Sequence, residues 1–200
     1  MAIPSQENPY QLFESWYAEA EACAAIDDHT AVTLATADES GIPDARVVLL
    51  KGFDERGFVF YTNLTSNKAK QLAANPHAAL CFYWMPLEKQ IRIRGAISPV
   101  TDEEADAYYA TRPRQSQIGA WASKQSQPIE TRFELERRIA RYAAKFGISP
   151  VPRPEFWSGF RIAPARIEFW LKQPFRLHDR AVYTRDPEQA SGWNRQRLFP

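Results

Sequence analysis

The sequence predicts a mainly β protein, an antiparallel β-barrel or roll with flanking α-helices. Five segments with strand-like alternation of residues lie within about seventy residues. The loops between these segments are short, which favours antiparallel pairing. One helix is expected among them, over residues 66–74, and it is too small to build a doubly wound parallel sheet.

The elements of the first half follow from local signals. Asn8 and Pro9 are typical of an N-cap and a first helical residue, and apolar residues then recur at helical spacing up to Asp27. This pattern predicts an amphipathic first helix. The period then changes to two, and β-branched and aromatic residues become frequent. Strands are expected over residues 31–37, 45–53, 58–63, 78–85 and 89–100.

The second half begins with helices and ends with strands. Thr101–Glu104 is a capping-box sequence and predicts a helix through Tyr109. Helices are also expected over 115–122 and 128–146. The second of these carries one apolar stripe, which favours a face toward the core over a surface for a partner. The stripe consists of Leu135, Ile139, Tyr142 and Phe146. After a Pro-rich connector, strands are expected over 159–163, 166–171 and 176–184, with a short one near the C-terminus.

The charge balance excludes several classes of partner. The chain has 25 Lys and Arg against 24 Asp and Glu, which gives a formal net charge of +1. Binding of nucleic acid or membrane through bulk positive charge needs a surplus of cations, so any anion site must be local. No run of about 18 apolar residues is present, and the polar start does not resemble a secretory signal. We therefore expect a cytoplasmic protein without a membrane span.

The residues that are absent narrow the chemistry further. The three histidines are far apart and form no HExxH or Cys/His ligand spacing, so no metal site is expected. The glycines form neither GxGxxG nor GxxxxGK[ST]. A bound phosphate would therefore be held by Arg, Lys and hydroxyl side chains, and arginine is well suited to this task.

Three groups of residues are candidates for a ligand site. If residues 176–180 form a strand, Arg176, His178 and Arg180 share one face, which is either a ligand wall or a solvated strand edge. Arg46 and Lys51 are an odd number of residues apart and point to opposite faces unless a bulge intervenes, so they could serve two ligands. Basic residues also stand at the expected helix starts 66–68 and 112–116, where anions are favoured.

Taken together, these segments resemble the pyridoxamine (pyridoxine) 5′-phosphate oxidase family. The resemblance covers nearly the whole chain after about residue 8. The segments that carry it are RVVLLK (46–51), FYTNLTSNKAKQ (60–71), LEKQIRIRG (87–95), TRPRQSQIGAWASKQS (111–126), FWSGFR (156–161), IEFW (167–170), RLHDR (176–180) and a C-terminal RLFP. It implies a split β-barrel homodimer with FMN at the subunit interface. The implied reaction is oxidation of pyridoxamine or pyridoxine 5′-phosphate to pyridoxal 5′-phosphate with O₂, giving H₂O₂.

The resemblance also implies site residues. The FMN-binding positions would be Arg46, Val47, Val48, Leu49, Leu50, Lys51, Tyr61, Thr62, Asn67, Lys68, Gln90, Gln125, Ser126, Trp170 and Arg180. The substrate phosphate would be held by Lys51, Tyr108, Arg112 and Ser116. Arg176 and His178 would lie over the pyridine ring and act in catalysis. Asn67 departs from the family pattern, which usually has Arg at this position.

On this basis residues 1–200 are expected to form one FMN-binding split-barrel domain. Residues 1–27 would supply the N-terminal helix, and residues 159–200 the strands that complete the site. Two alternatives belong to other classes. The first is a non-catalytic flavin- or haem-binding split barrel, which need not keep Arg112, Ser116, Arg176 and His178 together. The second is a nucleic-acid-binding surface around Arg92 and Arg94, which the near-zero net charge disfavours.

Overall fold

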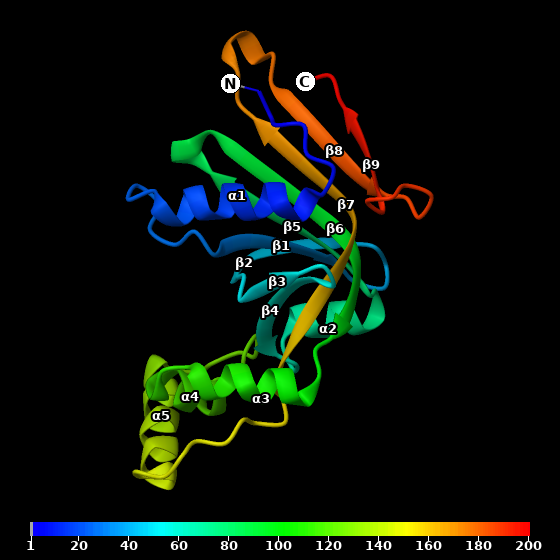
Figure 1. Cartoon of the computed structure of the whole chain (residues 1–200). Helices are drawn as coiled ribbons and strands as arrows, with labels where there is room; N and C mark the ends of the chain where they lie inside the picture. The colour runs from blue at the N-terminus through cyan, green and yellow to red at the C-terminus, as the bar shows by residue number, and fades with distance from the viewer. Residues whose placement is uncertain (1) are drawn as a thin grey trace.

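The computed structural model describes residues 2–200 and shows a curled antiparallel sheet with helices on its faces and at one end (Figure 1). Seven strands lie in the order β2-β1-β5-β6-β7-β4-β3, and β8 and β9 continue from β7. Every pairing is antiparallel. The predicted fold class, a mainly β antiparallel barrel or roll with flanking helices, is confirmed, and the sheet takes the form of a curled half-barrel.

The expected elements are present, with shifted ends in several places. The helices are α1 (Pro9–Ala22), α2 (Asn67–Ala74), α3 (Asp102–Thr111), α4 (Arg114–Ala122) and α5 (Arg132–Phe146), with two 3-10 turns, η1 (Met85–Leu87) and η2 (Pro174–Arg176). The strands are β1 (Ala31–Ala37), β2 (Pro43–Leu49), β3 (Gly52–Asp54), β4 (Gly57–Asn63), β5 (His77–Trp84), β6 (Lys89–Pro99), β7 (Trp157–Leu171), β8 (Asp179–Arg185) and β9 (Trp193–Arg197). Among residues 2–200, no helix is long and apolar enough to cross a membrane.

Strand β7 connects the part of the sheet that contains β3 and β4 with the part that contains β8 and β9. Its first half pairs with β4, its second half pairs with β8, and β6 runs beside both halves. The register shifts at Gly95, where an added Cβ would lie 1.9 Å from the Ala163 carbonyl oxygen. The absence of a side chain at Gly95 therefore allows the close approach at this bend. The two strands expected at 159–163 and 166–171 are one bent strand, with Pro164 at the irregularity.

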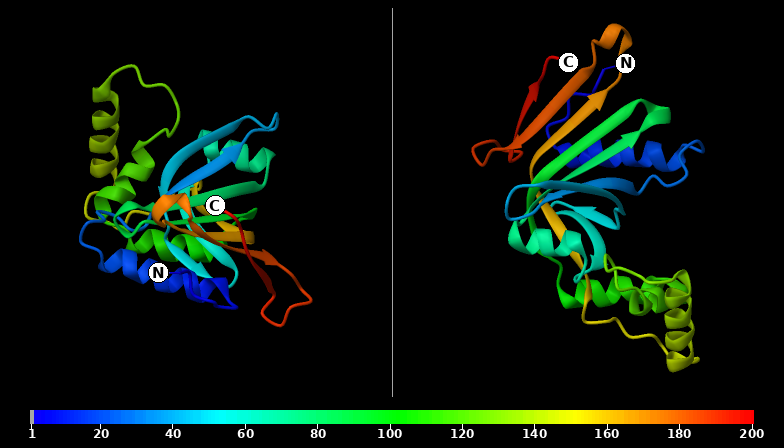
Figure 2. Two further views of the ribbon diagram at one scale, coloured as in Figure 1. Left: turned by 90° about the horizontal axis from the view of Figure 1, so that it is seen from above. Right: turned by 180° about the vertical axis from the view of Figure 1, so that it is seen from behind.

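The core lies between α1 and the sheet. Asn8 caps α1 by accepting the backbone N–H of Tyr10, and the buried face of the helix includes Phe13 and Trp16. Phe13 makes edge contacts with the rings of Phe58 and Phe82, so α1 is anchored to strands from both parts of the sheet. Figures 1 and 2 show both termini at the same end of the molecule, opposite the end that carries α3, α4 and α5.

Helix α5 differs from its prediction in two ways. It begins at Arg132 rather than at Pro128. Its predicted core-facing stripe is also wrong in part, because Leu135 and Ile139 are 39% and 41% exposed in this chain. Only the second half of the stripe packs, where Tyr142 and Phe146 contact the ring of Trp121 on α4. The helix therefore rests on α4 and does not contribute to the barrel core.

Candidate active site

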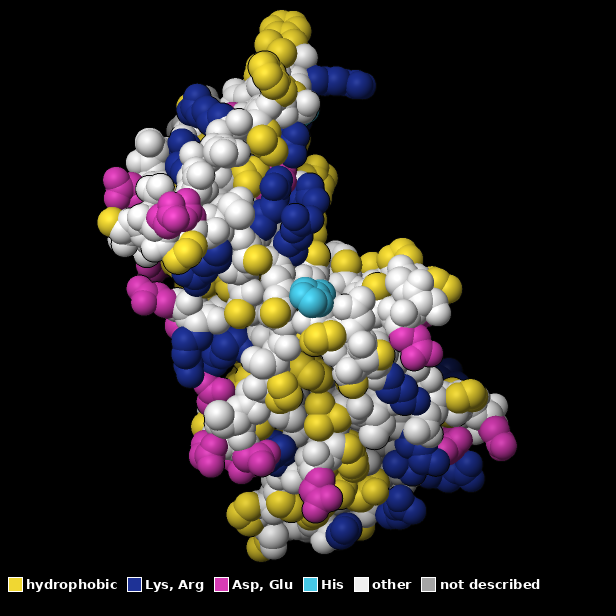
Figure 3. Space-filling model, turned by 90° about the vertical axis from the view of Figure 1, so that its right-hand side faces the viewer, with side chains coloured by type: hydrophobic (Ala, Val, Ile, Leu, Met, Phe, Trp, Pro, Cys, Tyr) yellow, Lys and Arg dark blue, Asp and Glu magenta, His cyan; other side chains and the backbone are white. Residues whose placement is uncertain are grey.

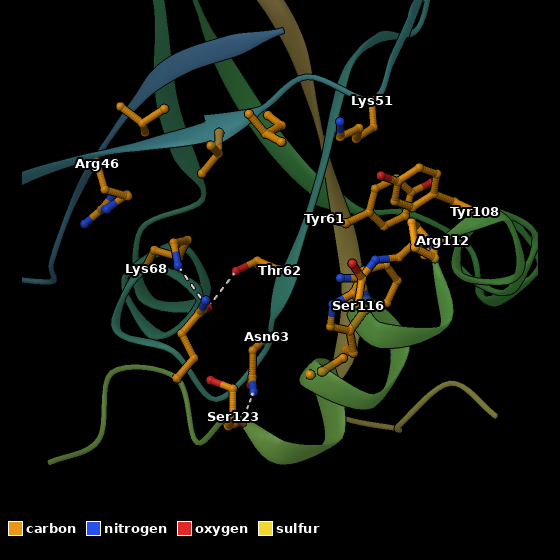
Figure 4. Close-up of a pocket in the computed structure, with 18 of the residues that line it drawn as sticks. Arg46, Lys51, Tyr61, Thr62, Asn63, Lys68, Tyr108, Arg112, Ser116 and Ser123 are labelled. Atoms are coloured by element: carbon orange, nitrogen blue, oxygen red, sulfur yellow. Dashed lines mark hydrogen bonds between the residues drawn. The ribbon is translucent and has the colours of Figure 1, made fainter. Parts of the chain in front are cut away.

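A pocket of about 690 Å³ lies between β2, β4 and the helices α2, α3 and α4. Its lining contains both apolar and polar side chains, and its cations are divided between two ends. Figure 4 shows Arg46 and Lys68 at one end and Lys51 and Arg112 at the other, with Thr62 between them. Two separate cationic ends in one pocket suit two anionic groups, or two ligands that each carry one.

The first end is built around the amide of Gln125. Its Oε1 accepts hydrogen bonds from Lys68 Nζ and Thr62 Oγ1, both at 3.1 Å. Arg46 stands nearby and donates to Thr36 Oγ1 at 2.5 Å. Burial lowers the pKa of Lys68, and the charge of Arg46 lowers it further, although Asp44 opposes the effect. A cation whose charged form is disfavoured in this way, as that of Lys68 is, favours a bound anion.

At the second end, aromatic rings hold a guanidinium. The rings of Tyr61 and Tyr108 stack at 4.1 Å, and Trp157 stacks on Tyr61 at 5.3 Å. Arg112 lies over the Trp157 ring with its Cζ 4.7 Å from the ring centre. The Arg112 Nη1 atom is buried and has no hydrogen-bond partner among residues 2–200. Burial lowers the pKa of Arg112, which two neighbouring tyrosines only partly offset. An unpartnered buried donor of this kind points to a ligand.

Lys51 and Arg46 face the same pocket, contrary to the expectation from their odd spacing. The continuous strand predicted over 45–53 is broken, because β2 ends at Leu49 and β3 begins at Gly52. Leu50 turns into the core, and the Lys51 backbone N–H is bonded to the Val59 carbonyl. This break changes the alternation, so both cations line the pocket.

A second group of predicted site residues lies elsewhere on the sheet. Gln90, Trp170 and Arg180 form one row across β6, β7 and β8, because Gln90 pairs with Trp170 and Trp170 pairs with Arg180. The His178 ring lies 4.6 Å from the Trp170 ring. None of these residues lines the pocket. Figure 1 shows the turn between β7 and β8, which contains η2, at the end of the molecule opposite to helices α3 and α4.

The strand predicted over 176–184 begins only at Asp179, so Arg176, His178 and Arg180 do not share a face through strand alternation. Phe175 and Arg176 have φ values of 57° and 62°, and the chain makes a turn there. His178 Nδ1 accepts the backbone N–H of Gln173 at 3.2 Å. A neutral His178 ring therefore carries its proton on Nε2.

Two family models match the chain. Residues 18–146 match the model described as pyridoxamine 5′-phosphate oxidase. The chain belongs to the pyridoxamine 5′-phosphate oxidase family. Residues 157–200 match a second model, described as the pyridoxine 5′-phosphate oxidase C-terminal dimerisation region. This second match covers the β7, β8 and β9 strands, which hold the row of Trp170 and Arg180.

Curated relatives extend the similarity over almost the full length. The chain is 56% identical over 194 residues to the pyridoxine/pyridoxamine 5′-phosphate oxidase of Rhodopseudomonas palustris (strain HaA2), with 97% of this chain and 91% of the relative covered. It is 55% identical over 192 residues to the protein of the same name from Brucella anthropi, with 96% and 94% covered. A solved structure, PhzG from Burkholderia lata 383 in complex with tetrahydrophenazine-1-carboxylic acid, is 32% identical. It has a TM-score of 0.90, and 98% of this chain and 94% of that chain are covered.

The residues suggested by the family resemblance divide into those in the pocket and those outside it. The pocket is lined by Arg46, Val47, Val48, Leu49, Lys51, Tyr61, Thr62, Lys68, Tyr108, Arg112, Ser116 and Gln125. Outside its lining lie Leu50, Asn67, Gln90, Ser126, Trp170, Arg176, His178 and Arg180. The Asn67 backbone N–H donates to Ser126 Oγ at 3.3 Å, so these two residues lie next to each other. Their chain neighbours Lys68 and Gln125 reach the pocket.

Sequence reasoning did not select several pocket residues. Trp157 and Asn63 both line the pocket, as do Ser123 and Gly119. Asn63 Nδ2 donates to the Ser123 carbonyl at 3.4 Å and so ties β4 to the end of α4. Trp157 belongs to the FWSGFR segment of the family resemblance, but its stacking on Arg112 joins the start of β7 to the end of α3, which meet only in the fold. No local pattern could have indicated that contact.

Proposed function

We propose that this chain oxidises pyridoxine 5′-phosphate and pyridoxamine 5′-phosphate to pyridoxal 5′-phosphate, with FMN as cofactor and O₂ as final acceptor. The observation that carries the proposal is the pocket with a cationic group at each end, in a chain of this family. For the alcohol, substrate and O₂ give pyridoxal 5′-phosphate and H₂O₂. For the amine, one water is also consumed and ammonia is released.

The residues at the first end of the pocket fit FMN. Arg46 and Lys68 offer two cations for its phosphate, and the apolar side chains of Val47 and Leu49 offer a wall beside them. The lowered pKa of Lys68, caused by burial and by Arg46, is consistent with a place for an anion. FMN, when bound, supplies the acceptor for a hydride from the substrate and the route by which its electrons reach O₂.

The second end fits the substrate phosphate. Arg112 offers a buried donor without a partner among the described residues, and Lys51, Tyr108 and Ser116 stand around it. The stacked ring of Trp157 limits the motion of the guanidinium before any ligand arrives. Binding energy from this phosphate handle can therefore orient the distant reacting carbon of the substrate.

We further propose that the complete site needs a second copy of the chain. The pocket and the row of Gln90, Trp170 and Arg180 lie apart within one chain, yet the family resemblance assigns both to FMN. The match of residues 157–200 to a dimerisation region supports a homodimer in which the row of one subunit faces the pocket of its partner. Exposed apolar side chains near this row, including Phe175, Leu177 and Tyr83, suit such an interface.

In this arrangement Arg176 and His178 act at the reacting end of the substrate. The His178 Nδ1 atom is occupied by the Gln173 N–H, so the neutral ring offers Nε2–H as a donor. We infer that His178 positions the oxygen or nitrogen on the reacting carbon by donating a hydrogen bond, rather than acting as a base from Nδ1. Arg176 lies in the exposed η2 turn, from which a long side chain can reach over a ring held by the partner.

The visible absorption spectrum of the purified protein tests the proposal directly. We expect a yellow protein that releases FMN on denaturation. When pyridoxine 5′-phosphate is added in air, pyridoxal 5′-phosphate and H₂O₂ should form in equal amounts. Light scattering should give twice the chain mass. A colourless protein that takes up no FMN, or a flavoprotein that does not turn over either substrate, would refute the enzyme and favour a non-catalytic split barrel.

Two further proposals accompany this function. We propose that residues 1–200 act as one FMN-binding split-barrel domain, with residues 1–27 supplying the N-terminal helix and residues 159–200 completing the site. Hydrogen bonds from Ile3 to Asp179 and from Tyr183 to Gln6 support this, because they tie the N-terminal segment to the C-terminal strands. A cytoplasmic location is proposed on the basis of the family.

A further inference from the structure

Glu168 is a buried carboxylate surrounded by arginines. It lies on β7 and is only 3% exposed. Its oxygens lie 2.7 Å from Arg180 on β8, 3.3 Å from Arg166 on β7 and 3.6 Å from Arg92 on β6. Figure 3 shows Lys and Arg side chains gathered among hydrophobic ones in the upper half of the molecule, where the C-terminal strands lie. Burying a carboxylate is costly, so a buried ion pair alone is weak evidence that the residue serves stability.

The contact with Arg180 fixes the orientation of its guanidinium. Arg180 Nε and Nη2 both donate to Glu168 Oε1, at 3.0 and 2.7 Å. Arg180 Nη1 donates to the Phe199 carbonyl at 2.9 Å. A guanidinium has five N–H groups in one plane. Three are used in these bonds, so each terminal nitrogen keeps one N–H without a partner among residues 2–200.

Glu168 occupies the row next to the one that we propose for FMN. Trp170 pairs with Gln90 and Arg180, and two residues earlier on β7 Glu168 pairs with Arg92 and Val182. Residues two apart on a strand point to the same face. Glu168 and Trp170 therefore point to the same face of the sheet. Arg180 pairs with Trp170, and the Glu168 carboxylate holds its guanidinium next to Trp170.

The charge of Glu168 also opposes repulsion within the cluster. Burial by itself would raise the Glu168 pKa, but the hydrogen bond and charge of Arg180, together with Arg92 and Arg166, hold it below its usual range. The carboxylate is therefore ionised at neutral pH. Without that charge, three guanidinium groups from neighbouring strands would repel one another, and Arg180 would lose two of its three hydrogen bonds.

We propose that Glu168 is a positioning residue that orients Arg180 toward the FMN bound in the partner's pocket. The inference rests on the proposed function and adds to it a residue that touches neither cofactor nor substrate. If Glu168 acts through Arg180, removing the Glu168 charge weakens FMN binding only when Arg180 is present. A residue that only stabilised the sheet would change affinity to the same extent with or without Arg180.

A double-mutant cycle on FMN binding tests this. The dissociation constant of FMN is measured by quenching of flavin fluorescence on apo-protein for wild type, Glu168→Gln, Arg180→Ala and the double variant. Glu168→Gln keeps an acceptor of nearly the same shape and removes the charge. We expect it to raise the dissociation constant by about tenfold, the effect of weakening one charge-assisted contact. In the Arg180→Ala background the same change should have less than about a twofold effect.

Glu88→Gln is the matched control, because Glu88 also pairs with a cation, Lys172 at 2.6 Å, but on the exposed surface. It should leave the FMN dissociation constant unchanged. Melting temperature and dimer mass identify any variant that has lost its fold. Glu168→Asp keeps the negative charge and should bind FMN more tightly than Glu168→Gln does. An unchanged affinity in Glu168→Gln, an equal loss in both backgrounds, or loss of the dimer in Glu168→Gln would overturn the inference. Failure of the wild type to bind FMN would instead overturn the proposed function.

Discussion

Replacing Arg112 by alanine should weaken substrate binding and leave FMN binding almost unchanged. Arg112 stands at the end of the pocket that we propose for the substrate phosphate, opposite Arg46 and Lys68, and its buried Nη1 has no partner among the described residues. A hydrogen bond to a charged group contributes about 1.5–3 kcal/mol. Its loss corresponds to a roughly ten- to hundredfold rise in the substrate dissociation constant. The stacking on Trp157 limits the entropy cost of ordering this side chain and favours the upper part of that range.

The same structure predicts how the variant affects stability. Arg112 is half-buried, and its buried Nη1 without a hydrogen-bond partner costs the folded state free energy. Arg112→Met, which keeps much of the side-chain volume over Trp157, should therefore leave the melting temperature of the ligand-free protein unchanged or raised. Arg112→Lys keeps the charge and loses the flat stack, so its substrate affinity should lie between wild type and Arg112→Ala.

The assay combines steady-state oxidation of pyridoxine 5′-phosphate with FMN titration of the apo-protein. Direct binding to the reduced enzyme under anaerobic conditions separates the dissociation constant from KM. Arg137→Ala, an exposed arginine on α5, is the control and should match wild type in both measurements. If Arg112→Ala loses FMN and substrate equally, or loses neither, the division of the pocket into two phosphate ends is incorrect.

Three further results are expected. FMN affinity should fall with rising pH before the usual lysine pKa of 10.5 is reached, because burial and the charge of Arg46 lower the pKa of Lys68 and only its protonated form attracts the phosphate. Lys68→Arg should flatten this dependence in fluorescence titrations. His178→Asn should reduce kcat moderately and leave the pH profile of kcat intact, because Nδ1 of His178 already accepts the Gln173 N–H. Disappearance of an ionisation between about pH 6 and 8 from that profile would instead assign His178 a base role. Asn67→Arg should tighten FMN binding by about 1 kcal/mol at low salt, with a smaller gain at high salt, and an unchanged dissociation constant would place this residue away from the phosphate.

Local signals predicted most of the elements correctly. The Asn8 cap and the Thr101–Glu104 capping box both form as expected, since each depends on residues within one turn. The strand predicted through Arg176 and His178 failed for the converse reason. Phe175 and Arg176 adopt positive φ values without the glycine that normally signals such a turn. A pattern of residue types cannot report a strained backbone that is held by tertiary contacts.

The site was less predictable than the fold. The side chains of Arg46 and Lys51 line the same pocket because the strand breaks at Leu50, which turns into the core. No pattern in the neighbouring residues predicts that break. The apolar stripe on α5 predicts a face toward the core, but half of it is exposed, because hydrophobic periodicity identifies the apolar side of a helix and not what covers that side. Residues such as Trp157 join the pocket only through packing between distant segments.

In the proposed homodimer, the pocket and the row of Trp170 and Arg180 that form one site come from different subunits, so neither half of the site suffices alone. An active enzyme could therefore be assembled from two inactive chains. In a random mixture of Arg112→Ala and Arg176→Ala subunits, about half of the dimers would contain one of each. In each such dimer both lesions fall in one site and the other site is intact, so mixing should restore about a quarter of wild-type activity.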